Sequence, residues 1–347
     1  MFKYIVKRVL LGILIIFGVS IILYALLKSV PGDFVVNRFM SNPNVANSPE
    51  RINQMRALYG LDANIFGGYI KWMFGDWWMP DSWFYDGSAF GAMRLNSRGA
   101  IAFDFGTSFV YEEPVTEVIA DHMWTSFALT LVSLIIYYPL AVFLGTRAAV
   151  KQYGAFDYTT TVLTMIGISF PTFFLSAIVI KIFVYDLGWF ELGLTSPDFS
   201  GSGWDLFWNQ AWHLILPMFV VVILSIGSVM RYTRTNMLEV LSADYIRTAR
   251  AKGLSERSVV YKHAFKNTMI PMVTVLAGLL PSLFGGSMIL EDCFNIPGIG
   301  QYSYNAMNQG DIMFVMGYNM FLAVLTVIGM ILTDIMYVVV DPRVKLT

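Results

Sequence analysis

Six uncharged and mostly apolar runs are spread along this chain of 347 residues. They cover residues 9–27, 123–146, 158–180, 206–230, 267–290 and 312–333. Each is long enough for a membrane-crossing helix, which needs roughly 20 residues to span a ~30 Å hydrocarbon layer. Because lipid cannot satisfy exposed backbone groups, each run must be helical. The pattern therefore predicts an all-α membrane protein with six transmembrane helices.

The first run resembles a secretory signal, because Lys3, Lys7 and Arg8 precede it. A signal core usually has about 7 to 15 apolar residues, and this run is longer, so we expect a retained helix. The runs divide the chain into a first segment with its helix at 1–27, an external domain at 28–122, and a five-helix core at 123–347. A cytoplasmic loop at 231–270 belongs to that core.

Composition agrees with a bilayer setting. The chain is 56% hydrophobic and only 14% charged, whereas soluble domains carry about 25% charged residues. The net charge of −1 makes nucleic acid an unfavourable partner. The single Cys293 cannot form an intrachain disulfide, and His122, His213 and His263 are too scattered to suggest a metal site. We expect no bound metal and stability from packing and lipid.

The distribution of lysine and arginine predicts the orientation. Basic residues lie before the first run, between the second and third, between the fourth and fifth, and after the last, where Arg343 and Lys345 stand. The richest segment holds Arg231, Arg234, Arg247, Arg250, Lys252, Arg257, Lys262 and Lys266. The alternate connections are acidic. Both termini are therefore expected in the cytoplasm of a multi-pass membrane protein.

Two features are expected in the external domain. Residues 49–60 have the apolar spacing of a short helix that ends at Gly60. Residues 76–87, with the sequence DWWMPDSWFYDG, combine aromatic residues with Pro, Asp and Gly. Such a segment suits a loop at the level of the lipid headgroups. A docking surface for an external partner is the alternative.

A polar, basic segment at 243–271, called the elbow below, lies between the fourth and fifth runs. Ser242 is expected to cap a first helix, Gly253 to end it in the left-handed conformation, and Ser255 to cap a second helix. Pro271 is expected to open the next span. Ala243, Ile246 and Ala249 fall on one side of the first helix. A basic loop that binds anionic lipid is the alternative to a shaped surface for a partner protein.

Several other positions have two readings. The segment GGSMILEDCF is expected to end the fifth helix, and Pro297, Gly298 and Gly300 precede a short external helix. Within the spans, Lys181 and Asp334 suit structural roles, with a proton relay at Asp334 as the alternative. Prolines inside or beside the spans are expected to kink them: Pro139, Pro171, Pro217 and Pro281.

Five segments, in order, resemble the B-type permease subunits of ATP-binding-cassette importers for oligopeptides, dipeptides and nickel. They are residues 4–33, 103–119, 244–271, 285–300 and 341–346. The resemblance covers nearly the whole chain and implies the type I importer permease fold and a location in the bacterial cell membrane. It also implies a second, homologous permease subunit, two cytoplasmic ATPase subunits and an external peptide-binding protein.

The elbow of this chain resembles a cytoplasmic loop of that family, whose first helix docks on the ATPase subunit. The resemblance places ATPase coupling at Asp244, Arg247, Thr248, Ala249, Arg250 and Gly253. Arg and Thr stand where the family motif has Glu and Ala, whereas Gly253, His263, Ala264 and Asn267 match the peptide class. The turn of Pro297, Gly298 and Gly300 resembles an external gate or docking element, and simple turn geometry is its alternative.

The chain has no GxxxxGK[ST] phosphate loop, so ATP and Mg²⁺ are expected only on partner subunits, and no catalytic residue is expected here. The interpretation is a non-catalytic permease subunit of an ATP-driven peptide importer that works by alternating access. Alternatives are a stand-alone transporter or channel, a membrane enzyme, and, within the family, a dipeptide or nickel-chelate importer. Residues 76–102 form a connection longer than the family's usual one, either as docking surface or as a tolerated insertion.

Overall fold

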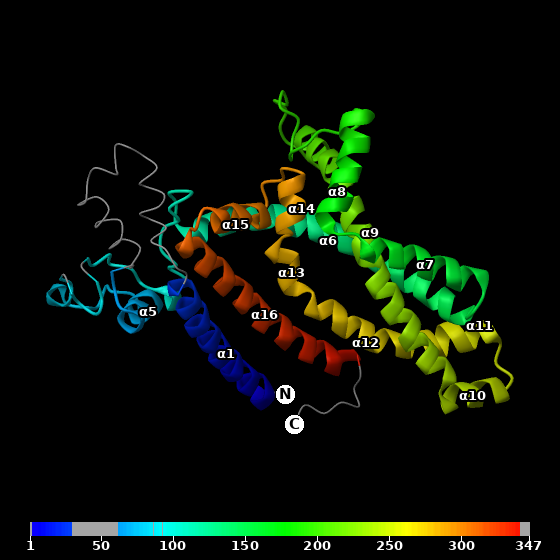
Figure 1. Ribbon diagram of the computed structural model, residues 1–347. Helices are drawn as coiled ribbons and strands as arrows, with labels where there is room; N and C mark the ends of the chain where they lie inside the picture. The colour runs from blue at the N-terminus through cyan, green and yellow to red at the C-terminus, as the bar shows by residue number, and fades with distance from the viewer. Residues whose placement is uncertain (1, 30–61, 86, 92, 341–347) are drawn as a thin grey trace. The chain divides into compact units, whose positions relative to one another are not determined.

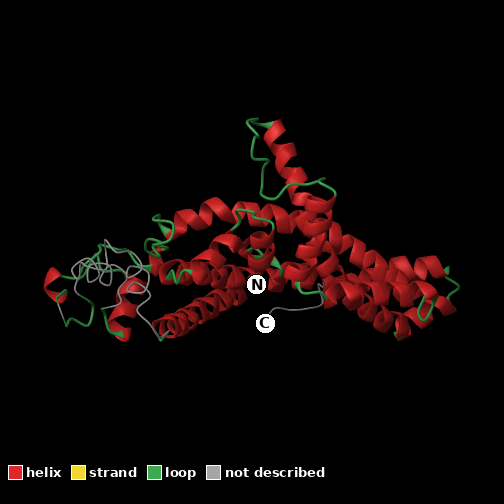
Figure 2. Cartoon of the chain, turned by 45° about the horizontal axis from the view of Figure 1, so that its top comes forward, coloured by secondary structure: helices red, strands yellow, loops and turns green. Residues whose placement is uncertain are grey.

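The computed structural model describes residues 2–29, 62–85, 87–91 and 93–340 (Figures 1 and 2). Helices account for all the regular elements in these ranges, which contain no β-strand beyond one isolated bridge between Thr107 and Pro114. The predicted all-α class is therefore confirmed. The helix expected at 49–60 and the basic residues Arg343 and Lys345 lie outside the described residues.

Five helices are long and apolar enough to cross a membrane, and a sixth span is possible if one bent pair counts as a single crossing. The first of these five is α1 (Phe2–Lys28), and the last is α16 (Ile312–Val340). Between them lie α6 (Val115–Val150), α9 (Trp204–Ser242) and a composite stretch at Glu256–Gly285. The described chain is thus a multi-pass membrane protein, as its apolar runs predict.

The third apolar run is not one straight helix. It consists of α7 (Ala155–Ser169) and α8 (Thr172–Ile180), which continues as the π-helical turn η3 (Lys181–Asp186), and the two parts are bent by 96°. Pro171 stands at the break, where it lacks an N–H and disfavours helical backbone at the preceding residue. The expected effect of this proline is confirmed in a stronger form than a kink.

Other prolines lie where the backbone continues. Pro139 is inside α6 and Pro217 inside α9. Pro271 is inside α12 (Phe265–Gly278), so the expectation that it opens the fifth span is wrong. The span begins earlier because α11 (Glu256–Ser258) and the π-helical turn η4 (Val259–Ala264) run directly into α12.

The fifth span ends earlier than its apolar run. After α12, α13 (Leu280–Gly285) stops at Gly286, whose φ of 68° lies in the left-handed region that favours glycine. The next residues form a separate helix, α14 (Met288–Cys293). The expectation of one helix to residue 290 is wrong because hydrophobicity continues across a backbone break.

The described chain folds as two compact units. Of the described residues, the core unit contains 2–5, 122–302 and 328–340, and the N-terminal unit contains those within 6–121 and 303–327. In the core unit α7 lies along α9 (Figure 1). A Cβ at Gly227 would lie 2.7 Å from the carbonyl oxygen of Thr164, so small residues bring these helices into backbone contact.

The N-terminal unit joins α1 to α5 (Ile65–Phe74) through aromatic rings, with Tyr24 in contact with Tyr69 and Trp72. A second anchor is Asp311, which is fully buried at the start of α16. Its carboxylate accepts hydrogen bonds from the Ser108 hydroxyl at 2.5 Å and the Val110 N–H at 3.1 Å. The residues before α6 are therefore tied to α16.

Candidate functional site

The first helix of the elbow is α10 (Asp244–Ala251), which is buried on one side and exposed on the other. It follows α9 after a single residue, Ala243. On its apolar side Ile246 is fully buried and Ala249 nearly so. They share one cluster with apolar side chains of α6, α9 and η4: Ala149, Met237, Val259, Val260 and Ala264. The helix is therefore seated on three neighbouring elements.

The two predicted serine caps are not formed. Ser242 is the last residue of α9, and its hydroxyl donates to the carbonyl oxygen of Glu239. The residue at the N-cap of α10 is Ala243, which has no side chain that can accept. Ser255 does occupy the N-cap of α11 but makes no capping hydrogen bond. The Ser242 cap fails because α9 runs to the edge of α10 and leaves Ser242 within a helix.

The predicted stop at Gly253 is confirmed. Its φ is 78°, and a Cβ there would meet nothing within 4 Å, so backbone conformation alone favours glycine. An ion pair crosses this turn. The Arg250 guanidinium donates to both carboxylate oxygens of Glu256, at 2.7 and 3.1 Å. This bidentate pair ties the end of α10 to the start of α11, and the sequence reading did not include it.

Of the six predicted coupling residues, one is buried and five are exposed. Ala249 is buried in the apolar cluster. The others are exposed: Asp244, Arg247, Thr248, Arg250 and Gly253. The Arg247 and Asp244 side chains lie 3.6 Å apart and are 74% and 97% exposed. This surface mixes charges of both signs, and it lies on a helix whose opposite side is buried against neighbouring elements.

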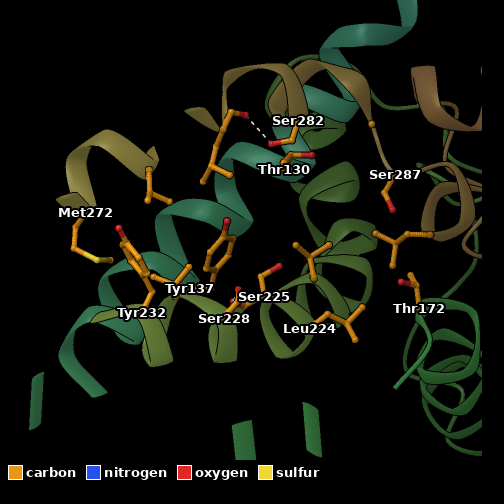
Figure 3. Close-up of a pocket in the computed structure, with 16 residues that line it drawn as sticks. Thr130, Tyr137, Thr172, Leu224, Ser225, Ser228, Tyr232, Met272, Ser282 and Ser287 are labelled. Carbon is orange, nitrogen blue, oxygen red and sulfur yellow. Dashed lines mark hydrogen bonds between the residues drawn. The ribbon is translucent and has the colours of Figure 1, made fainter. Parts of the chain in front are cut away.

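A cavity of about 620 Å³ lies among the helices of the same unit (Figure 3). It is lined by residues of α6, α8, α9, α12, α13 and α14 and of the segments next to α13. Half of its sixteen lining residues carry a hydroxyl: Thr130, Tyr137, Thr172, Ser225, Ser228, Tyr232, Ser282 and Ser287. None of the sixteen is charged. The cavity therefore offers neutral hydrogen-bonding groups on an apolar wall, a lining that motif searches do not detect.

The predicted turn of Pro297, Gly298 and Gly300 lies beside a buried carboxylate. Gly300 is already inside α15 (Ile299–Asn308). The side chain of Glu291, from α14, is fully buried and accepts hydrogen bonds from this turn and from α6. Burial raises the pKa of Glu291, and its hydrogen bonds act in the opposite direction. The sequence reading missed this residue, although an acidic residue between glycine pairs was visible.

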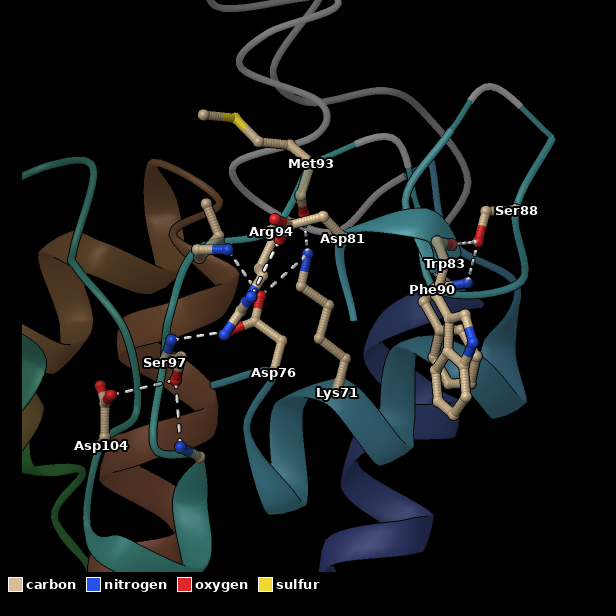
Figure 4. A network of polar contacts seen from close by, with 12 residues as sticks. Lys71, Asp76, Asp81, Trp83, Ser88, Phe90, Met93, Arg94, Ser97 and Asp104 are labelled. Carbon is tan, nitrogen blue, oxygen red and sulfur yellow. Dashed lines mark hydrogen bonds and ion pairs between the residues drawn. The ribbon is translucent and has the colours of Figure 1, made fainter. Parts of the chain in front are cut away.

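The described residues of the long connection at 76–102 form an ordered loop with contacts of its own (Figure 4). It contains the short 3-10 turns η1 (Asp81–Trp83) and η2 (Ala100–Ala102). Buried Asp76 accepts from the Leu95 and Ser97 N–H groups at 2.6 and 2.7 Å. Lys71 lies 3.7 Å from the same carboxylate, and burial lowers the pKa of this lysine. The loop expected at 76–87 is confirmed where it is described.

Within this loop, aromatic residues are left open to the surroundings. Trp77, Trp78 and Tyr85 are 58%, 48% and 62% exposed. The ring of Trp83 stacks on that of Phe90 with centroids 5.3 Å apart. The exposed rings fit either of the two expected roles of this segment, the headgroup level or a docking surface.

Comparison with known proteins adds two family matches. Residues 138–346 match the family described as binding-protein-dependent transport system inner membrane component. Residues 1–130 match the N-terminal domain of such membrane components. Among curated relatives, the oligopeptide transport system permease protein AppB of Bacillus subtilis is 33% identical, with 99% of this chain and 100% of the relative covered. The dipeptide transport system permease protein DppB of the same species is 30% identical, with 100% and 99% covered.

Proposed function

This chain belongs to the family of binding-protein-dependent transport system inner membrane components, and we propose that it is a permease subunit of an ATP-driven peptide importer. The family match and the full-length similarity to two peptide permeases support the proposal. The observation that carries the coupling part is α10, a short helix with a buried apolar seat and an exposed polar surface. Its partners would be two ATPase subunits, a second permease and an external binding protein.

We place the elbow and both termini in the cytoplasm. The basis is the concentration of lysine and arginine around α10, which the positive-inside rule assigns to that side. On this orientation α10 faces the compartment that supplies ATP. The ATP and Mg²⁺ would be held by the partner subunits, since no phosphate loop occurs in this sequence.

Coupling would proceed by movement of α10 as a rigid body. Ile246 and Ala249 join it to α6, α9 and η4, and the Arg250–Glu256 pair holds the turn at Gly253. A displacement imposed on the exposed side of α10 would therefore be passed to the membrane helices rather than absorbed in a loose loop. The permease would alternate between two states whose balance the nucleotide shifts.

The hydroxyl-lined cavity would be this chain's share of the solute pathway. Its neutral groups can exchange hydrogen bonds with peptide backbone N–H and C=O groups, which every peptide carries. Since no charged residue lines it, peptide termini would not be held by ion pairs there. Selection of the solute would then rest mainly with the external binding protein.

The test is uptake by reconstituted vesicles that contain the complete complex. We expect labelled peptides to accumulate only with ATP, both ATPase subunits and the binding protein present, and a length series would define the substrate range. A catalytically dead ATPase subunit is the matched control. Uptake by this chain without ATP or partners would contradict the proposal and favour a stand-alone transporter.

A further inference from the structure

We propose that Glu291 is a positioning residue that seats the turn at 297–300 on α6 and thereby keeps the external end of the pathway closed. The inference deepens the proposed function and rests on it, because it assigns a transport role to a buried carboxylate. It starts from a geometric fact. Glu291 has no exposed surface, although it lies on the short helix α14 between two turns rather than in a membrane span.

The carboxylate joins three parts of the core unit. One oxygen accepts from the Ser126 hydroxyl of α6 at 2.8 Å and from the Ser287 N–H at 2.9 Å. The other accepts from the Gln301 N–H of α15 at 3.0 Å, and the Gly300 N–H also donates to this carboxylate. A single side chain therefore holds α6, the segment before α14, and the start of α15.

The pattern of donors fits the ionised carboxylate. Backbone N–H groups only donate. Ser126 also receives the Ile299 N–H at 2.9 Å on its hydroxyl oxygen, which directs its own hydrogen toward Glu291. The groups that bond to the carboxylate are all neutral donors, and two of them belong to the first turn of α15. A negative charge is favourable at a helix N-terminus.

Close packing around the carboxylate leaves no room for another side chain. A Cβ at Gly298 would lie 2.5 Å from both a Glu291 oxygen and the Ser126 hydroxyl oxygen. A Cβ at Gly286 or Gly300 would lie 2.7 Å from a Glu291 oxygen. The glycines of this segment are thus explained by the approach of backbone to the carboxylate. A second contact secures the same turn, because His122 of α6 stacks on Tyr302 and its Nδ1 lies 3.1 Å from the Pro297 carbonyl oxygen.

This arrangement has two well-separated states. With the turn seated, the buried charge has its full set of donors. If the turn moves away from α6, Ser126 and the α15 amides no longer meet the carboxylate, and an unsatisfied buried charge is costly. The turn is therefore either seated or released into water. Because Gly286, Ser287 and Leu290 also line the cavity, release would open the end of the cavity next to α14.

The test uses the reconstituted complex with Glu291→Gln, and with Asp292→Asn as the matched control. Asp292 is adjacent, acidic and exposed, so its variant removes the same charge without touching the seat. The Gln amide places an N–H₂ against a site built largely of backbone N–H groups, which only donate. We expect Glu291→Gln to lower the ratio of peptide-stimulated to basal ATPase activity about tenfold, the factor that corresponds to 1.4 kcal/mol. Asp292→Asn should retain the native ratio.

Thiol labelling measures directly whether the turn at 297–300 is held against α6, and it does not depend on transport. In a Cys293→Ser background, Ile299→Cys places a thiol at a fully buried position of the turn. We expect Glu291→Gln to speed its modification by a thiol reagent about tenfold, while Ile246→Cys, at a fully buried position of the elbow, stays protected. Protection at the elbow shows that the release is local and not unfolding.

Ser126→Ala supplies the second variant. If Ser126 and Glu291 act as one contact, the double variant should label no faster than Glu291→Gln alone. Unchanged labelling and unchanged ATPase stimulation in Glu291→Gln would overturn the inference, as would an equal effect of Asp292→Asn. If Glu291→Gln speeds labelling but the complex with the original sequence transports no peptide, the positioning role of Glu291 stands. The proposed transport function is then contradicted.

Discussion

At the scale of residues, a few positions are fixed by backbone or burial rather than by chemistry with a ligand. Gly253 is the clearest, because its left-handed backbone ends α10 and nothing crowds it. Glu291 and Asp311 are buried carboxylates satisfied by hydroxyl and backbone donors. Each such residue sets the position of a helix end. Substitutions there should alter the geometry of a turn before they alter the stability of the whole chain.

Gly253→Val should impair coupling. A β-branched residue at φ 78° is strained, and left-handed backbone costs an L-residue about 1–2 kcal/mol. We expect ATP-driven uptake and ATPase stimulation to fall severalfold in the reconstituted complex. Gly188→Val is the matched control, since Gly188 has φ 63° and equally open surroundings but lies outside the elbow. Normal uptake by the Gly253 variant would contradict the proposed role of this turn.

Acidic medium on the outer side should inhibit transport before it unfolds the protein. Burial raises the pKa of Glu291, so it takes up a proton at a higher pH than an exposed glutamate. A raised folded-state pKa means that the folded chain binds this proton more tightly than the unfolded chain, so this group does not lower stability as the pH falls. Protonation nevertheless removes the charge that fits the donor set of the turn.

Uptake measured against external pH checks this expectation. The loss should be reversible and should begin above about 4.3, the ordinary glutamate value. His122 lies against the turn and Asp292 is next to Glu291 in the sequence, so His122→Asn and Asp292→Asn serve as controls. Glu291→Gln should show low uptake that no longer depends on pH in this range. An acid limb that survives in Glu291→Gln would assign the effect to another group.

At the scale of elements, the core unit is built so that helices move together. α7 and α9 meet backbone to backbone, and the carboxylate of Asp157 accepts two hydrogen bonds from Arg234, at 2.6 and 2.7 Å. α10 packs on α6, α9 and η4. These contacts are the physical basis for treating the elbow as part of a rigid body in the proposed mechanism.

Gly227→Ala should loosen the contact of α7 with α9. The added methyl group would lie 2.7 Å from the Thr164 carbonyl oxygen, and overpacking of this kind costs about 1–3 kcal/mol. We expect a lower thermal midpoint of the purified complex. Gly18→Ala is the matched control, because Gly18 is also helical but a Cβ there meets nothing within 4 Å. A native midpoint for Gly227→Ala would show that the helices can separate at little cost.

Two neighbouring substitutions in α10 should distinguish the packing of α10 on its own chain from its proposed docking on an ATPase subunit. Ile246→Ala removes a fully buried side chain and should cost about 2–5 kcal/mol of stability. Arg247→Ala changes an exposed side chain, so the thermal midpoint should stay native while ATPase stimulation falls. Thermal unfolding and ATPase assays on the same complexes distinguish the two effects. Native ATPase stimulation in Arg247→Ala would count against docking at this surface.

At the scale of the whole molecule, the sequence predicted the class of fold and the number of apolar segments well. The bilayer directly requires apolar segments of a certain length, so these segments can be recognised in the sequence without knowledge of tertiary contacts. Breaks at Pro171 and Gly286 were harder, because apolar character continues through them and only backbone geometry reveals the bend. The cap at Ser242 failed because the end of α9 depends on its packing against neighbouring elements.

The candidate site was predictable in part. The elbow was visible as a basic segment with a glycine, and the seat of Ile246 and Ala249 followed from helical spacing. The partners of Glu291 were not visible, because Ser126 lies 165 residues away along the chain. The hydroxyl-lined cavity was likewise hidden, since serine and threonine are ordinary residues in membrane helices and gather only when the chain folds.

The most direct measurement is site-specific cross-linking from α10 in the complete complex. In a Cys293→Ser background, Thr248→Cys places a thiol on the exposed surface of α10, and Gly278→Cys places one on α12, away from the elbow. We predict that the α10 thiol cross-links to an ATPase subunit, that ATP changes the yield, and that the α12 thiol does not cross-link to that subunit. A complex that transports peptide with ATP but gives no cross-link from any exposed position of α10 would contradict the account.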